Sequence, residues 1–145
     1  MAHPRRLRFA LQLRDAADGP SWTGLARQAE ADGYDVISMP DHLDGQLAPI
    51  PALAAAAAIT ERVGLSMFVL ANDHRHPAVL AKEIATIDVL SGGRVELGLG
   101  AGWMESEYRA VGVAFDPPGR RIERLAEAIT VVRGLFSESP FTFTG

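Results

Sequence analysis

Residues 91–103 constrain the fold of this chain more than any other segment, and they read Ser-Gly-Gly-Arg-Val-Glu-Leu-Gly-Leu-Gly-Ala-Gly-Trp. Two glycines end a helical pattern, a short apolar strand follows, and the strand runs into a glycine-rich loop. A helix, a turn, a strand and a loop in this order form part of a repeating βα pattern. In a barrel built from such units, the loops after the strands carry the chemistry.

Short apolar segments alternate with amphipathic segments along the chain. The predicted strands are residues 8–13, 35–39, 63–70 and 95–99, and the predicted helices are residues 22–32, 50–62, 77–91 and 120–136. The strands begin at residues 8, 35, 63 and 95, so successive starts are 27, 28 and 32 residues apart, close to the roughly 30 residues of a βαβ unit. This alternation predicts a parallel sheet, in either a closed barrel or an open doubly wound sheet.

The last helical segment is the clearest, because an apolar stripe predicts which of its faces packs on the core. The stripe consists of Ile122, Leu125, Ala126, Ile129, Val132 and Phe136. Arg120, Arg121 and Arg124 are expected on the solvent face of the same helix. Residues 105–119, which precede it, are predicted to be irregular.

Length limits which of these folds the chain can form. A complete eight-unit barrel needs about 200 residues at minimum, whereas the chain has 145 residues and four predicted units. We therefore expect a single domain over residues 1–145 that is the N-terminal half of a (β/α)8 barrel, truncated from a protein about twice as long. An open doubly wound sheet would need one more strand than the sequence contains. A half barrel has exposed sheet edges, which favours a homo-oligomer or pairing with a missing C-terminal half.

Composition restricts the partners of the chain. Apolar residues make up 48% and charged residues 22% of the sequence, and the net charge is −4, which is typical of a soluble globular protein and argues against a nucleic-acid partner. The absence of cysteine excludes disulfides, thiolate nucleophiles and cysteine-ligated metals. The longest apolar run, residues 52–59, is too short to span a membrane, and the N-terminus does not resemble a signal peptide. We expect a cytoplasmic protein.

The glycine-rich loop is similar to two nucleotide-binding motifs but matches neither. A dinucleotide fingerprint needs Gly-x-Gly-x-x-Gly directly before a helix, and the third glycine would be Trp103 or Glu105 here. A phosphate loop is excluded because no Gly-Lys-Ser/Thr follows. Two interpretations remain open: the bare backbone lets a flat ring lie close to the main chain, or small residues serve the packing of a tight turn.

Histidines follow two of the predicted strands. His42 comes just after the second strand, where a histidine can act as a base near neutral pH and Asp41 can orient it. The ordinary alternative for this pair is a helix cap or a surface ion pair. His74 and His76 follow the third strand, but further ligands at zinc spacing are missing, so no metal is expected. His76 is instead expected at the entry to the next helix.

Aromatic and acidic residues follow the glycine-rich loop. Trp103 and Tyr108 are candidates for the wall of a substrate pocket, with packing over the rim of the sheet as the alternative. Glu105 and Glu107 are expected to be solvated or to cap a helix.

Five segments together resemble the bacterial luciferase-like flavin and deazaflavin oxidoreductases. They are Ser-Met-Pro-Asp-His at 38–42, Val-Gly-Leu-Ser-Met at 63–67, His-Pro at 76–77, Ser-Gly-Gly-Arg at 91–94 and Gly-Leu-Gly-Ala-Gly-Trp at 98–103. The later Tyr108 and Gly112 fit the same pattern, so the resemblance covers nearly the whole chain. It is specific for the superfamily and not for any subfamily.

The resemblance implies a TIM barrel whose C-terminal mouth binds reduced FMN or the deazaflavin coenzyme F420. Such an enzyme is a monooxygenase or transfers a hydride to or from a small organic substrate. The resemblance implies that His42 transfers a proton and that Ser66–Met67 is the site of a non-proline cis peptide behind the cofactor ring. The residues it places beside the cofactor are Asp41, Ser66, Met67, Asn72, Gly100, Ala101 and Gly102.

Two features limit what the resemblance implies. Trp103 stands where the deazaflavin-dependent sugar-phosphate dehydrogenases have an acid, which argues against a sugar-phosphate substrate. The chain also contains only half of the barrel units. The alternative to an enzyme is therefore a truncated, non-catalytic half barrel that dimerises through its open sheet edges.

Overall fold

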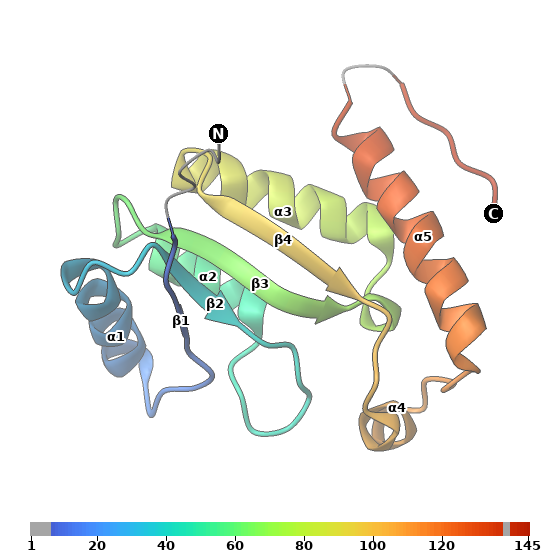
Figure 1. The fold of residues 1–145 in the computed structure, drawn as a ribbon, viewed down its shortest axis with the longest axis horizontal. Coiled ribbons are helices and arrows are strands. Elements are labelled where there is room, and N and C mark those ends of the chain that lie inside the picture. Colours follow the sequence, from blue (N-terminus) through green and yellow to red (C-terminus); the bar gives the residue numbers. More distant parts are fainter. Residues whose placement is uncertain (1–6, 138–139) are drawn as a thin grey trace, which may run out of the picture.

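The computed structural model describes residues 7–137 and 140–145, and its centre is a four-stranded sheet (Figure 1). The strands are β1 (Ala10–Gln12), β2 (Val36–Met39), β3 (Gly64–Ala71) and β4 (Val95–Gly100). They lie in the order β1-β2-β3-β4, and each neighbouring pair is parallel. Consecutive βαβ units produce this order, so the predicted parallel sheet is confirmed.

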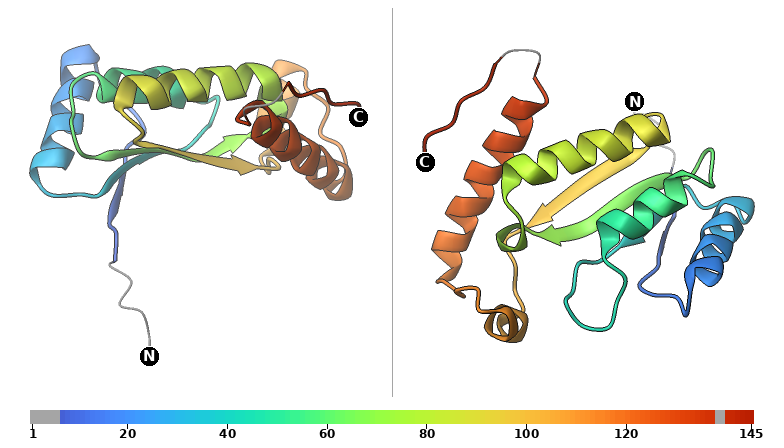
Figure 2. Two further views of the ribbon diagram at one scale, coloured as in Figure 1. Left: turned by 90° about the horizontal axis from the view of Figure 1, so that it is seen from above. Right: turned by 180° about the vertical axis from the view of Figure 1, so that it is seen from behind.

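Three helices connect the strands and lie on one face of the sheet, whereas no helix of the described residues covers the other face (Figure 2). They are α1 (Gly19–Ala31), α2 (Pro49–Ala57) and α3 (Pro77–Ser91). A doubly wound sheet has helices on both faces, so this arrangement is the wall of a βα barrel. No helix within the described ranges is long and apolar enough to cross a membrane.

Three further elements lie beyond the C-terminal ends of the strands. They are the 3-10 turn η1 (Asn72–His74), which leads from β3 to α3, and the helices α4 (Glu105–Val111) and α5 (Pro118–Leu135) after β4. The prediction that residues 105–119 are irregular is therefore wrong for α4. A helix of seven residues is too short to produce a recognisable hydrophobic period.

Side chains alternate between the two faces of the sheet, as the pleat of a strand requires. Toward the helices, Ile37, Met39, Leu65 and Met67 are completely buried. On the bare face, a hollow of about 450 Å³ is lined by Arg8, Ala10, Gln12, Val36, Ser38, Ser66, Phe68 and Glu96. The core therefore lies between the sheet and its helices, and the bare face corresponds to the lumen of a complete barrel.

Helix α2 ends at Ala57, earlier than predicted, because a carboxylate of α1 accepts hydrogen bonds from the backbone that follows. Oε2 of Glu30 accepts the N–H groups of Glu61, Arg62 and Val63 at 2.9, 2.6 and 2.9 Å. Burial alone would raise the pKa of Glu30, but these backbone hydrogen bonds hold it below its ordinary value. The turn before β3 is thereby tied to α1.

The guanidinium of Arg94 fastens the N-terminal end of β4. Nε donates to the carbonyl of Ser91 at 2.7 Å, and Nη1 donates to the carbonyl of Val63 at 2.9 Å and the hydroxyl of Thr60 at 3.0 Å. Nη2 donates to the carbonyls of Ala57 and Thr60 at 2.9 and 3.0 Å. The five N–H groups of a guanidinium thus all have acceptors, and we call this arrangement of Arg94 the arginine clamp.

Helix α5 packs with a face that only partly coincides with its predicted apolar stripe. Ala128, Val131 and Val132 are buried, whereas Ile122 and Phe136 of the stripe are 58% and 50% exposed. The helix contacts α3 and η1, and two of its arginines reach the loops beside it. Because Val132 belongs to the stripe, the predicted packing face is right in part and is shifted toward Ala128 and Val131.

Candidate functional site

A pocket of about 410 Å³ at the C-terminal end of the sheet is lined by the loops after β2 and β4, the last residues of β3 and helix α4. Of the residues predicted for the site, the pocket contains Asp41, His42, Gly100, Ala101, Gly102, Trp103 and Tyr108. Its other lining residues are Pro40, Phe68, Val69, Leu70, Ala71, Met104 and Glu107. Most of the predicted site residues therefore come together, although they are widely separated in the sequence.

Asp41 fixes the loop after β2 to the loop after β3. Its side chain is 2% exposed. Oδ2 accepts the N–H of Ala71 at 2.9 Å, and the guanidinium of Arg75 donates to Oδ2 at 2.5 Å and to Oδ1 at 2.9 Å. A carboxylate with both oxygens engaged in this way holds the backbone in place. The orienting partner of His42 is a different carboxylate.

That partner is Glu107, which the sequence analysis expected to be solvated or capping. Nδ1 of His42 lies 3.0 Å from Oε1 of Glu107, and the same oxygen accepts the N–H of Leu43 at 3.0 Å. The side chains of His42 and Glu107 are only 19% and 10% exposed. The indole of Trp103 meets the imidazole edge to face, with ring centroids 6.0 Å apart. His42 therefore lines the pocket with its ring position fixed from two directions.

The glycines after β4 make room for β3 and for Tyr108. A Cβ on Gly98 would lie 2.5 Å from the carbonyl oxygen of Met67, and a Cβ on Gly100 would lie 2.8 Å from a methyl of Val69. Gly102 has a φ of +76°, and a Cβ there would lie 1.9 Å from the hydroxyl of Tyr108. Close packing within the chain is thus sufficient reason for glycine at these positions, in line with the packing interpretation of the loop.

Strand β3 is irregular where it borders the pocket. Its register with β4 shifts between Met67 and Leu70, and the peptide bond between Phe68 and Val69 is cis. The expectation of a cis bond at Ser66–Met67 is therefore corrected to the peptide that begins two residues further along the strand. Past the shift, Phe68 and Val69 both line the pocket.

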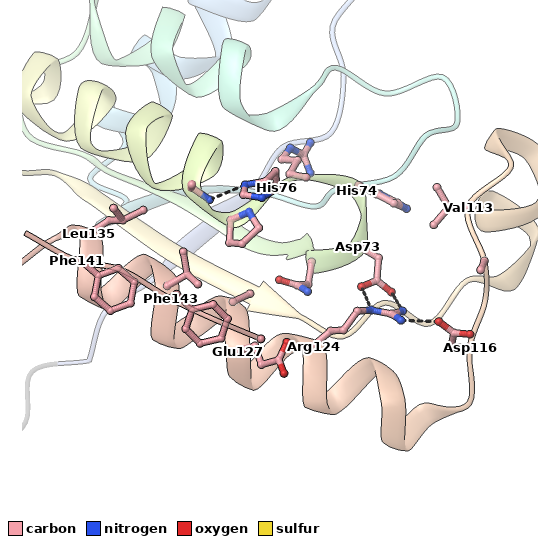
Figure 3. A pocket seen from close by; sticks show the side chains of 18 residues that line it. Asp73, His74, His76, Val113, Asp116, Arg124, Glu127, Leu135, Phe141 and Phe143 are labelled. Atoms are coloured by element: carbon pink, nitrogen blue, oxygen red, sulfur yellow. Dashed lines mark hydrogen bonds and ion pairs between the residues drawn. The ribbon is translucent and has the colours of Figure 1, made fainter.

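Tyr108 is buried behind the glycine-rich loop and contacts a charged network, of which Asp73, Arg124 and Asp116 are shown in Figure 3. Its hydroxyl donates to Oδ2 of Asp73 at 3.2 Å, and Arg124 binds both oxygens of Asp73 at 3.0 and 2.8 Å and also pairs with Asp116. Burial and the negative charge of Asp73 raise the pKa of Tyr108 to about 12. Burial would raise the pKa of Asp73, but Arg124 holds it below its ordinary value. The prediction that Arg124 lies on the solvent face of its helix is therefore wrong.

Arg121 holds the glycine-rich loop from the other side. Nη1 donates to the carbonyls of Gly102 and Ala101, and Nε donates to the carbonyl of Asp116 at 2.9 Å. The guanidinium also lies 4.1 Å from the ring centroid of Phe115. Arg121 is 8% exposed, so its predicted place in solvent is wrong. Helix α5 therefore contributes to the shape of the pocket.

Three predicted site residues lie away from this pocket. Met67 is buried in the core and Ser66 lies on the bare face of the sheet. Asn72 lines a second hollow of about 820 Å³, bordered by η1, α5 and the C-terminal segment (Figure 3). Near it, Nδ1 of His76 accepts the N–H of Ala78 at 3.2 Å and caps α3, which confirms its predicted place at the helix entry. In the described ranges no three side chains come together to hold a metal ion.

The pocket has the composition expected for the flat ring of a flavin or deazaflavin. Its walls are mostly apolar with a few polar groups, and its volume of about 410 Å³ falls in the usual range for small-molecule sites. Among the described residues that line it, there is no arginine or lysine. The residues present fit such a ring, whereas its anionic tail would need a cationic site elsewhere in the protein.

Comparisons with known proteins agree with this geometry. Residues 11–145 match the profile of a family described as luciferase-like monooxygenase. An F420-dependent glucose-6-phosphate dehydrogenase from Microbacterium testaceum is 36% identical over an alignment of 148 positions, which covers 96% of this chain and 44% of that protein.

Two solved structures have a fold similar to that of this chain. The monooxygenase RslO1 from Streptomyces bottropensis has a TM-score of 0.81 and 26% identity over 96% of this chain and 46% of its own. An F420-dependent secondary alcohol dehydrogenase, solved with an F420-acetone adduct, has a TM-score of 0.80 and 26% identity over 94% of this chain and 44% of its own. The chain thus spans less than half the length of each of these three relatives.

Proposed function

The chain belongs to the luciferase-like monooxygenase family, and we propose that it is the N-terminal half of an oxidoreductase that uses reduced FMN or coenzyme F420 on a small organic substrate. Its fold is half of a TIM barrel. The observation that carries the proposal is His42, held 3.0 Å from Glu107 in a mostly apolar pocket at the C-terminal ends of the strands. The names of the F420-dependent relatives favour the deazaflavin.

When bound, the cofactor would donate a hydride to the substrate, accept one from it or activate oxygen, and the chain would supply the proton transfer and the shape of the site. His42 gives or accepts the proton that accompanies this chemistry. Trp103, which is 72% exposed at the pocket, covers the substrate and excludes water.

The residues around the ring have positioning roles in this proposal. The backbone from Gly100 to Gly102, which Arg121 and Tyr108 hold in place, would border the ring. Phe68 and Val69 replace Ser66 and Met67 as its neighbours on β3. Asp41 keeps the loop of His42 in place through Arg75.

Binding is tested first, by fluorescence titration of the purified chain with FMN and with coenzyme F420. We expect saturable binding of one cofactor, with F420 favoured. Absence of binding to either, together with a concentration-dependent dimer in size-exclusion chromatography, would contradict the proposal for this chain and favour the non-catalytic half barrel.

Catalysis is tested in the complete protein with the His42→Ala variant. We expect kcat to fall about 10²–10⁴-fold, the usual contribution of a positioned proton donor or acceptor, with little change in cofactor affinity. Unchanged turnover would remove His42 from the mechanism. An alcohol and glucose 6-phosphate are informative substrates, because the two F420-dependent relatives are described as dehydrogenases of these classes.

A further inference from the structure

Glu107 is held in place independently of the histidine that it contacts. It lies in the first turn of α4, where its N–H donates to the carbonyl of Met104 at 3.0 Å. Its Oε1 accepts the backbone N–H of Leu43 at 3.0 Å, and a backbone N–H can only donate a hydrogen bond. The carboxylate therefore keeps its position beside His42 whatever the protonation state of the imidazole.

An ionised carboxylate can only accept hydrogen bonds, so Nδ1 of His42, 3.0 Å from Oε1, must carry a hydrogen. In a neutral imidazole the hydrogen is then on Nδ1, and Nε2 keeps its lone pair. We propose that Glu107 selects this tautomer of His42 and thereby makes Nε2 the atom that exchanges a proton with the substrate. The catalytic consequence rests on the proposed function, whereas the tautomer does not.

The other ionisable groups that line the pocket do not compete for His42. Both oxygens of Asp41 are bound by Arg75 and a backbone amide, and the hydroxyl of Tyr108 donates to Asp73. Trp103 meets the imidazole edge to face and carries no charge. Selection of the tautomer is thus assigned to one residue, which makes it a positioning residue with a measurable signature.

The test is the ¹⁵N spectrum of the His42 ring in the 145-residue chain, recorded at a pH where the imidazole is neutral. We expect protonated Nδ1 and unprotonated Nε2 in the wild type and in Glu107→Gln, whose amide oxygen can still accept the hydrogen bond. In Glu107→Ala we expect the hydrogen to move largely to Nε2. The control is Glu105→Gln, at a solvent-exposed glutamate of the same helix that pairs with Arg109, and it should leave the ring signals unchanged.

Kinetics in the complete protein add a second readout. We expect Glu107→Ala to lower kcat about 10²-fold or more with little change in KM, and Glu107→Gln to recover most of the loss. A wild-type spectrum with the hydrogen on Nε2, or an unchanged tautomer in Glu107→Ala, would overturn the inference. If neither cofactor bound, the proposed function would be contradicted instead, and the ¹⁵N result would still stand.

Discussion

The polar side chains at the two ends of β4 find hydrogen-bond partners to different extents. At the N-terminal end, the arginine clamp has an acceptor within the chain for each of its N–H groups. At the C-terminal end, Nδ1 of His42 is engaged, and large apolar side chains remain uncovered, with Trp103 72% and Phe68 65% exposed. The difference teaches that the N-terminal end is fastened by contacts within the chain, whereas the C-terminal end carries the pocket to which the proposed function assigns the ligand, as βα barrels place their active sites.

The largest effect is expected from breaking the arginine clamp with Arg94→Met. The change leaves the carbonyls that accept from Arg94 without these hydrogen-bond donors, and we expect the free energy of unfolding to fall by about 3–5 kcal/mol. Urea denaturation followed by circular dichroism measures it. The control is Arg27→Met, at an exposed position of α1, where we expect a change within about 0.5 kcal/mol. Equal losses in the two variants would show that the clamp does not stabilise this end.

The next effect is expected at the opposite end, in Gly102→Ala. Its φ of +76° disfavours any side chain, and the new Cβ would meet the hydroxyl of Tyr108. The matched control is Gly112→Ala, because Gly112 has a φ of +74° with nothing within 4 Å of the added Cβ. We expect about 1–2 kcal/mol of destabilisation from the backbone in both variants, and about 1–3 kcal/mol more in Gly102→Ala from overpacking. Equal values would mean that Tyr108 moves aside freely.

The sequence was informative where a local pattern has a local cause. Gly92 and Gly93 end α3 with positive φ values, and the apolar strand after them is β4, so its position could be predicted from the segment alone. The alternation of strands and helices likewise predicted the parallel sheet. Period-two alternation fails in β3, however, because the irregularity between Met67 and Leu70 moves Phe68 and Val69 to the pocket.

Contacts between distant residues could not be predicted in the same way. Glu107 lies 65 residues after His42, and α4 is too short for a periodic signal that would place its side chains. Arg121 and Arg124 follow an ordinary polar pattern along their helix, and only the path of α5 across the loops reveals that they bind Gly102 and Asp73. Polar residues that organise a site from a distance therefore resemble surface residues in the sequence.

A smaller effect is expected from Tyr108→Phe, which removes one hydrogen bond to a carboxylate. We expect a loss of about 1–2 kcal/mol at neutral pH. Because burial raises the pKa of Tyr108 from 10.0 in the unfolded chain to about 12, its contribution is complete below pH 10 and is lost as the pH rises to about 12. The difference in stability between the wild type and the variant should shrink over that range. A difference that is constant from pH 8 to 12 would contradict the burial of this hydroxyl.

The smallest effect on stability is expected from Trp103→Ala, although this change should affect ligand binding at the pocket most directly. The indole is 72% exposed and contacts the edge of His42, so its removal should change the free energy of unfolding by less than about 0.5 kcal/mol. Val89, which is 80% exposed near the opposite end of the sheet, provides the control variant Val89→Ala. If the C-terminal end is the ligand-binding end, only Trp103→Ala weakens cofactor or substrate binding in a fluorescence titration. Equal affinities for both variants would place the ligand away from this pocket and would remove the functional half of the contrast between the two ends.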